Sequence, residues 1–140
     1  MPNRILVDSS FLYALQDRSD KYNKAAVQFV TQHQFTPLVP DVALTEVAQM
    51  VKKFLGERAV LLFLDAVSGE SPLELEGISK GDIQRARSIL ETYLGARLDF
   101  VDCCLMAISE RLNITQICTF DRRDFSIFRP RHCDFLELMP

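Results

Sequence analysis

The segment from Ile5 to Val7 is the feature that most constrains the fold of this chain. It places three aliphatic residues in succession, and Asp8 follows directly. Such a run, without alternating polar positions, is typical of a strand buried on both faces of a parallel sheet. A helical pattern begins at once with Phe11, and in open α/β sheets ligands bind beyond the carboxyl ends of the strands. Asp8 is therefore either a candidate site residue or the N-cap of the next helix.

Length and composition indicate one domain, residues 1–140, with a sizeable core. The chain has 140 residues, of which 48% are hydrophobic, and its net charge is −3. That charge argues against a broadly basic surface for coating nucleic acid. It does not exclude a nuclease, because metal ions can neutralise an acidic site locally. The sequence has no apolar run long enough for a transmembrane helix or a signal peptide, so we expect a cytoplasmic protein without a membrane partner.

The pattern of the four cysteines is also typical of a cytoplasmic protein. Cys103 and Cys104 are adjacent in a helical pattern, Cys118 lies in an apolar run, and Cys133 is near the C-terminus. The sequence contains no C-x-x-C pair, which argues against a zinc ribbon or a redox motif. We interpret them as small hydrophobic residues in a reducing environment.

Strand-like runs alternate with helical spacing along the chain, which predicts an α/β fold with a short, mostly parallel central sheet. Strands are expected at 4–8, 36–40, 72–75, 115–120 and 135–138, with 72–75 at a sheet edge. The first two helices are expected to end at about 16 and to begin at Asp20. Further helices are expected from an Asp41 cap to Gly56, at 58–67, at 80–94 after a Ser79 cap, and from Asp99 to about Leu112.

Three further acids stand at informative positions. Glu46 borders the apolar stripe of its predicted helix, because it lies three residues after Ala43 and four before Met50. Asp102 lies in the first turn of a later helix, and Asp121 ends the second apolar strand. A carboxylate beside a buried face is costly unless something pairs with it.

Each acid also has a structural interpretation. The spacing from Asp99 to Asp102 is that of a capping box, in which Asp102 would be the reciprocal acid. The spacing from Asp121 to Asp124 would similarly suit the start of a short helix. Taken singly, the capping role is favoured for each of them.

Taken together, the acids indicate a shared site. Asp8 and Asp121 both end buried strands, and neighbouring parallel strands lie about 4.8 Å apart, so the two converge if their strands are adjacent. Carboxylates in one cleft raise each other's pKa unless a cation compensates. Mg²⁺ or Mn²⁺, bound through oxygen ligands, suits a site with a few carboxylates.

Four segments in this order resemble the motifs of PIN domains, and the resemblance is greatest to the VapC-type toxins of toxin–antitoxin pairs. The segments are 7–12, 44–47, 99–105 and 119–125. The resemblance implies an α/β/α sandwich and an endoribonuclease that uses Mg²⁺ or Mn²⁺. It makes Asp8, Glu46, Asp102 and Asp121 the catalytic acids, with the three aspartates as metal ligands. An adjacent pair of cysteines at 103–104, where the family more often has small residues such as alanine, is a departure.

Five other residues are candidate supporting groups. Ser10 and Thr119 match small hydroxyl residues of the family near the first and last acids. Asp99 either caps its helix or shares the metal site. Arg122 and Arg123 either bind RNA phosphates as bidentate donors or serve solubility and ion pairing with a neighbouring acid.

The resemblance also implies partners, namely an RNA substrate, a small antitoxin protein and a second copy of the chain in a homodimer. A PIN-like module that binds nucleic acid or serves as a scaffold without catalysis remains an alternative, as does a housekeeping RNA-processing nuclease. A phosphatase or receiver domain fits less well, because the sequence contains no Asp-x-Asp or adjacent acid pair. DNA as the substrate also stays open.

Overall fold

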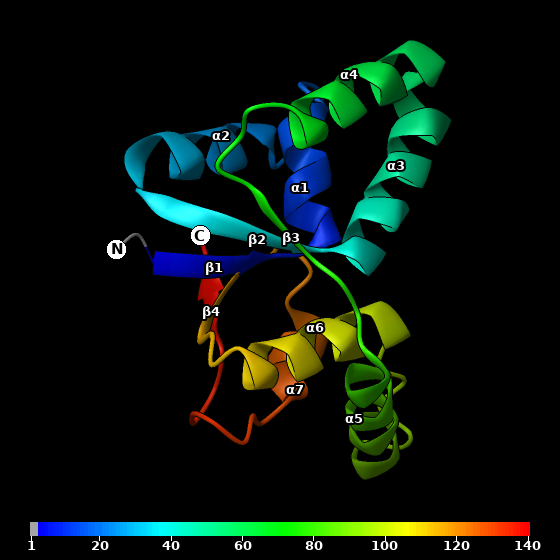
Figure 1. Cartoon of the computed structure of the whole chain (residues 1–140), viewed down its shortest axis with the longest axis vertical. Coiled ribbons are helices and arrows are strands. Elements are labelled where there is room, and N and C mark those ends of the chain that lie inside the picture. The colour runs from blue at the N-terminus through cyan, green and yellow to red at the C-terminus, as the bar shows by residue number, and fades with distance from the viewer. Residues whose placement is uncertain (1–2) are drawn as a thin grey trace.

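A computed structural model describes residues 3–140, and within them five strands form one parallel sheet. The strand order is β3-β2-β1-β4-β5, so the first strand is central (Figure 1). The predicted parallel sheet is confirmed, and so is the placement of the third strand at an edge. The strands are β1 (Asn3–Val7), β2 (Phe35–Pro40), β3 (Glu74–Glu76), β4 (Gln116–Cys118) and β5 (Glu137–Met139).

The central strand β1 is buried because it has a neighbouring strand on each side. Leu6 pairs with Leu38 of β2 and with Ile117 of β4, and none of these side chains is more than 1% exposed. Burial of each such side chain contributes about 1.5–3 kcal/mol to stability. The aliphatic run at the start of the sequence is therefore the centre of the core, as predicted.

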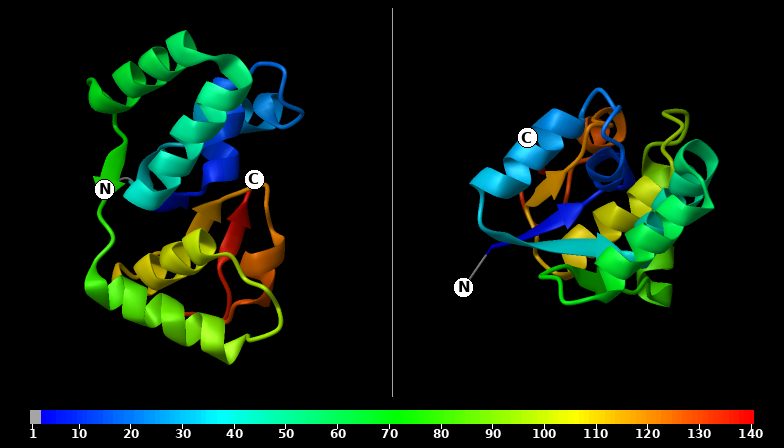
Figure 2. Two further views of the ribbon diagram at one scale, coloured as in Figure 1. Left: turned by 90° about the vertical axis from the view of Figure 1, so that its right-hand side faces the viewer. Right: turned by 90° about the horizontal axis from the view of Figure 1, so that it is seen from above.

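Helices cover both faces of the sheet, so the predicted α/β/α sandwich is confirmed (Figures 1 and 2). One layer holds the first four helices, and the other holds the last three together with the loop that leads from α7 to β5. The first layer is α1 (Ser9–Gln16), α2 (Asn23–Gln32), α3 (Asp41–Leu55) and α4 (Glu57–Ser68), and the second is α5 (Lys80–Thr92), α6 (Phe100–Arg111) and α7 (Arg123–Ile127).

One predicted helix start and one predicted helix cap are wrong. The second helix begins at Asn23 rather than Asp20, because Asp20 forms a turn in which its carboxylate accepts the Tyr22 N–H at 2.9 Å. The third helix begins on Asp41 itself, with Pro40 in the N-cap position, so Asp41 is not a cap. The acid is still favourable there, because the N-terminal end of a helix dipole attracts negative charge.

An ion-pair network joins α5 to α6. Ser79 caps α5 as predicted, and it forms a full capping box with Asp82. The buried Asp82 carboxylate also accepts two hydrogen bonds of 3.0 Å from the Arg111 guanidinium. Beside it, Arg85 binds Glu110 with an Nε–Oε1 distance of 2.6 Å. Packing of these two helices therefore depends on paired charges as well as on apolar contacts.

We expect Asp82→Ala to lower the free energy of unfolding by about 3 kcal/mol, because it removes the acid of the capping box and leaves Arg111 without its buried partner. Urea denaturation at neutral pH measures this loss. Arg87→Ala is the matched control, since the Arg87–Glu91 pair is exposed and its removal should cost less than about 1 kcal/mol. Equal effects of the two variants would show that the network contributes nothing.

The stabilisation by Asp82 should also depend on pH. Burial alone would raise the pKa of this carboxyl, but hydrogen bonds from Arg111 and Ser79 outweigh burial and lower the pKa below its ordinary value of 3.8. The contribution is therefore fully present above the ordinary pKa and is lost as the pH falls through the lowered one. The difference in stability between wild type and Asp82→Ala should shrink in acid.

Two predictions from composition concern the same residues, 3–140. No helix in this range is long and apolar enough to cross a membrane. All four cysteines in it are free, and three of them, Cys103, Cys104 and Cys118, are buried in the core as predicted.

Candidate active site

Asp8 lies at the carboxyl end of β1, where its backbone N–H donates to the Cys118 carbonyl of β4 at 3.0 Å. It occupies the N-cap position of α1, but its side chain makes no capping bond to any described residue. The carboxylate instead accepts hydrogen bonds from Thr119 Oγ1 at 2.7 Å and Ser10 Oγ at 3.0 Å. The interpretation of this side chain as a simple cap is therefore wrong.

Ser10 and Thr119 hold the ends of β1 and β4 together. Their hydroxyl oxygens lie 3.2 Å apart. Ser10 Oγ accepts the backbone N–H of Phe120 at 2.9 Å, and Thr119 Oγ1 accepts that of Asp121 at 3.0 Å. The two hydroxyls predicted as supporting groups thus connect Asp8 with the chain that carries the last predicted acid.

Asp102 enters the same region from the first turn of α6, and its side chain is buried. Burial, the charge of Asp8, a hydrogen bond with Asp124, and the charges of Asp124 and Asp99 together raise the pKa of Asp102 to about 10. Burial also raises the pKa of Asp8, although the Thr119 and Ser10 hydroxyls oppose that shift. The structure therefore brings Asp8 and Asp102 together, as predicted.

Asp99 does not form the predicted capping box with Asp102. It occupies the N-cap position of α6, yet its side chain makes no capping bond within residues 3–140. Its backbone N–H donates to Asp124 Oδ2 at 2.8 Å, and its carboxylate is exposed but close enough to raise the pKa of Asp102. The spacing of the sequence therefore assigned Asp99 to a cap, whereas its carboxylate lies near Asp102.

Asp121 lies at the rim of the cluster. Its side chain is exposed, but its charge contributes to the raised pKa of Asp8. It does not cap α7, whose N-cap position is held by Arg122. Asp8 and Asp121 thus follow adjacent strands as predicted, with one carboxylate buried and the other open to solvent.

Asp124 is a site residue that sequence reasoning missed. It is buried in the first turn of α7, where it contacts Asp102 and accepts the Asp99 N–H. The sequence places it beside Phe125, a core residue, and within the fourth motif. The available signal was the position of this acid directly before a core aromatic residue in a very short helix. In such a helix the acid can be buried together with the aromatic residue beside it.

Glu46 is connected to the acids through Ser9. It is half-buried on α3, and its carboxylate accepts a hydrogen bond from Ser9 Oγ. The same hydroxyl lies 3.5 Å from Asp8 Oδ1. Ser9 is buried and was not anticipated. The structure therefore attaches the predicted glutamate to the opposite side of Asp8 from Thr119.

The two predicted arginines have partners of their own. Arg123 binds Asp124 Oδ1 at 2.8 Å and donates to the Ala96 carbonyl. Arg122 donates to the carbonyl of Pro140. Arg123 thus forms the ion pair that was its structural interpretation, whereas the contact of Arg122 is with the last carbonyl of the chain.

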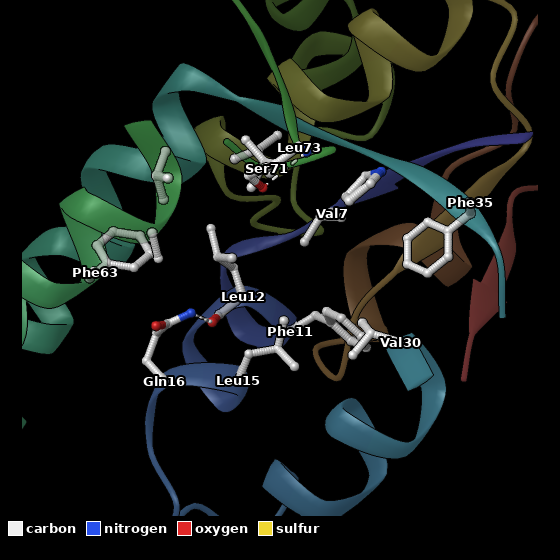
Figure 3. Close-up of a pocket in the computed structure, with 14 residues that line it drawn as sticks. Val7, Phe11, Leu12, Leu15, Gln16, Val30, Phe35, Phe63, Ser71 and Leu73 are labelled. Atoms are coloured by element: carbon white, nitrogen blue, oxygen red, sulfur yellow. Dashed lines mark hydrogen bonds between the residues drawn. The ribbon is translucent and has the colours of Figure 1, made fainter. Parts of the chain in front are cut away.

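An apolar cavity of about 250 Å³ lies between α1, α2, α4 and the sheet (Figure 3). Phe63 and Phe35 face it from opposite sides, and Leu12 and Leu15 of α1 line it. No acidic residue of residues 3–140 lines this cavity. It is therefore separate from the cluster of carboxylates, which has the polar groups needed for chemistry.

Comparison with known proteins gives matches over almost the whole chain. The model of the PIN domain family matches residues 5–129. Ribonuclease VapC26 of Mycobacterium tuberculosis is 25% identical over 126 residues, which cover 90% of this chain and 93% of that protein.

Solved structures give similar results for the fold. VapC20 of M. tuberculosis, described as a toxin that cleaves the sarcin-ricin loop, has a TM-score of 0.83 at 19% identity, covering 97% of this chain and 99% of that one. A toxin–antitoxin complex from Klebsiella pneumoniae has a TM-score of 0.64 at 19% identity, covering 87% and 90%. These likenesses confirm the predicted PIN-like architecture.

Proposed function

Because this chain belongs to the PIN domain family, we propose that it is a metal-dependent endoribonuclease of the VapC toxin type. The names of VapC26, a ribonuclease, and VapC20, a cleaving toxin, support the proposal. The observation that carries it is the pairing of Asp8 with Asp102 in a buried, polar setting. Such strongly perturbed acids in one cluster are typical of functional sites.

The donor set suits Mg²⁺ or Mn²⁺, which prefer carboxylate oxygens. Residues 3–140 contain no preformed group of three or more His, Cys, Asp or Glu arranged to hold a metal ion. Burial, together with the charges of neighbouring acids, raises the pKa of both Asp8 and Asp102, and a bound divalent cation would stabilise their charged forms. We propose Asp8, Asp102 and Asp121 as ligands, with Asp124 as an added candidate.

A bound divalent cation would lower the pKa of a water molecule and stabilise negative charge on the scissile phosphate. The protein's own groups set the geometry. Thr119 and Ser10 orient the Asp8 carboxylate, and the contact with Asp124 orients Asp102. Ser9 donates its hydroxyl proton to Glu46 and lies 3.5 Å from the Asp8 carboxylate. Such supporting bonds keep ligands in place and commonly affect activity 10- to 100-fold.

The proposal is tested by RNA cleavage with purified protein in Mg²⁺ or Mn²⁺ and then in excess EDTA. We expect cleavage with either metal and a rate at least about tenfold lower with EDTA, because the carboxylates alone leave negative charge on the phosphate uncompensated. Replacing the removed metal should restore the rate. Cleavage that continues unchanged in EDTA would exclude the metal mechanism, and RNA binding without cleavage would favour the non-catalytic module.

We also propose an antitoxin partner and a homodimer in the cytoplasm. The named toxin–antitoxin complex from K. pneumoniae supports a protein partner. Several large apolar side chains on α3 and α4 are exposed, which is typical of a protein interface. These are Phe54, Leu55, Leu61, Leu62 and Leu64.

A further inference from the structure

Three aromatic rings form a stack that runs from the core to the surface beside the acid cluster. The rings of Phe11 and Phe120 have centroids 5.6 Å apart and are inclined by 14°. The rings of Phe120 and Tyr22 have centroids 4.3 Å apart and are inclined by only 4°. Phe11 is buried, Phe120 is half-buried, and Tyr22 is 37% exposed. The stack therefore ends in an accessible, parallel ring.

The stack is directly connected to the site. Phe120 lies between Thr119 and Asp121, and its backbone N–H donates to Ser10 Oγ at 2.9 Å. That hydroxyl donates in turn to Asp8. In Figure 2 the loop between α1 and α2, which carries Tyr22, lies on the same side of the molecule as α7 in both views. A nucleotide chain at the acids would therefore pass close to the Tyr22 ring.

The Tyr22 ring is held in place before any ligand binds. Its backbone N–H donates to the Asp20 carboxylate at 2.9 Å. Asp17 fixes the start of the same loop by accepting two hydrogen bonds from Ser19. Asn23 Nδ2 donates to the Ala14 carbonyl at 2.7 Å and ties the loop to α1. A preorganised ring loses little conformational freedom when another ring stacks on it.

A positive charge accompanies the exposed ring. Lys21 Nζ lies 4.9 Å from the Tyr22 centroid, and Phe120 occupies one face of that ring. An exposed cation–π contact is weaker than the stacking of a base on an aromatic side chain, so a base can displace the ammonium. The displaced lysine would then be within reach of the phosphate that follows the base.

From this arrangement we propose that Tyr22 is the stacking platform for one unpaired nucleobase of single-stranded RNA, next to the phosphate at the acid cluster. The proposal rests on the nuclease function proposed above and assigns it a positioning residue. Single-stranded RNA fits because its bases are free to leave their own stack and rest on an aromatic face. The stacking is tolerant of base identity, since every base has such a face.

The test uses an unstructured RNA oligonucleotide of mixed sequence that the wild type cleaves. Tyr22→Leu should raise KM about tenfold, from the usual contribution of one stacked base, and change kcat little. Tyr22→Phe should match the wild type, because phenylalanine keeps the ring that stacks on Phe120. Val27→Ala, at an exposed apolar position on α2, is the control for surface truncation.

Abasic substrates separate stacking from a structural role. An abasic nucleotide at one position should raise KM for the wild type and add nothing for Tyr22→Leu, whereas other positions should affect both proteins equally. The proposal would be overturned if an abasic nucleotide at every position raised KM by the same factor in the wild type and in Tyr22→Leu. It would also be overturned if the KM of Tyr22→Leu were that of the wild type. If no RNA is cleaved, fluorescence anisotropy with the same oligonucleotides still tests stacking by binding alone, and so the two proposals fail separately.

Discussion

Asp102→Asn should lower RNA cleavage by at least about 100-fold, which corresponds to losing about 3 kcal/mol of transition-state stabilisation. Asparagine retains the shape of the side chain but offers a cation only one neutral oxygen in place of a carboxylate. The fold should survive, because the amide can donate to Asp124 as the protonated Asp102 carboxyl does. The free energy of unfolding without metal should stay within about 1 kcal/mol of the wild type.

Thermal melts with and without Mn²⁺ complete this experiment. The wild type should melt at a higher temperature in Mn²⁺, because a ligand that binds only the folded state stabilises it. Asp102→Asn should lose most of that increase. Cleavage by Asp102→Asn at the wild-type rate would remove this residue from the metal site.

Asp99→Asn is the matched control within the same helix turn. The capping interpretation implies that Asp99→Ala costs about 1 kcal/mol, but the observed side chain makes no capping bond within residues 3–140. We therefore expect both Asp99 variants to unfold within about 0.5 kcal/mol of the wild type, with cleavage retained. If Asp99→Asn abolishes cleavage and Asp102→Asn does not, the roles of the two acids are reversed.

Thr119→Val should lower cleavage by about 10- to 100-fold, the usual range for a group that orients a metal ligand. Valine preserves the volume of this buried side chain but removes the hydroxyl that donates to Asp8 and accepts the Asp121 N–H. Stability should fall by about 1–3 kcal/mol, because polar groups lose a buried partner. Rates must therefore be compared at a temperature at which both proteins are folded.

Two controls isolate the hydroxyl of Thr119. Thr119→Ser retains it and should cleave within a few-fold of the wild type, with a stability loss of about 1 kcal/mol for the missing methyl group. Ser109→Ala removes another buried hydroxyl, whose bond is to the Met106 carbonyl in its own helix. It should affect stability without affecting the rate. A rate for Thr119→Val equal to that of Thr119→Ser would exclude the orienting role.

The sequence predicts the centre of the fold well, because the residues of β1 are compatible with few structures other than a buried strand. A run of aliphatic residues that ends in an acid fits a buried parallel strand, and the structure has that strand in the middle of the sheet. The same reasoning places Asp8 and Asp121 at the ends of neighbouring strands, because apolar patterns encode directly where strands end. Asp102 was assigned to the same site by the resemblance to PIN domains.

The direction in which an acid points is harder to predict. Asp99 and Asp102 have the spacing of a capping box, but spacing does not distinguish a carboxylate that bonds to its helix from one that lies beside another acid. Asp124 was missed for a related reason, since its partners come from α6 and from the loop before it. Contacts between separate elements are set by packing, which one sequence does not reveal.

The hydrogen bonds that the Asp8 carboxylate accepts come from parts of the chain that the ribosome synthesises at very different times. Asp8 and Ser10 leave the ribosome early, whereas Thr119 is separated from Asp8 by 111 positions. A nascent chain cannot orient its first acid until β4 has been synthesised and has paired with β1. Translation itself thus delays the formation of this site, because a contact between residues so distant in sequence forms only after the intervening chain can close the loop.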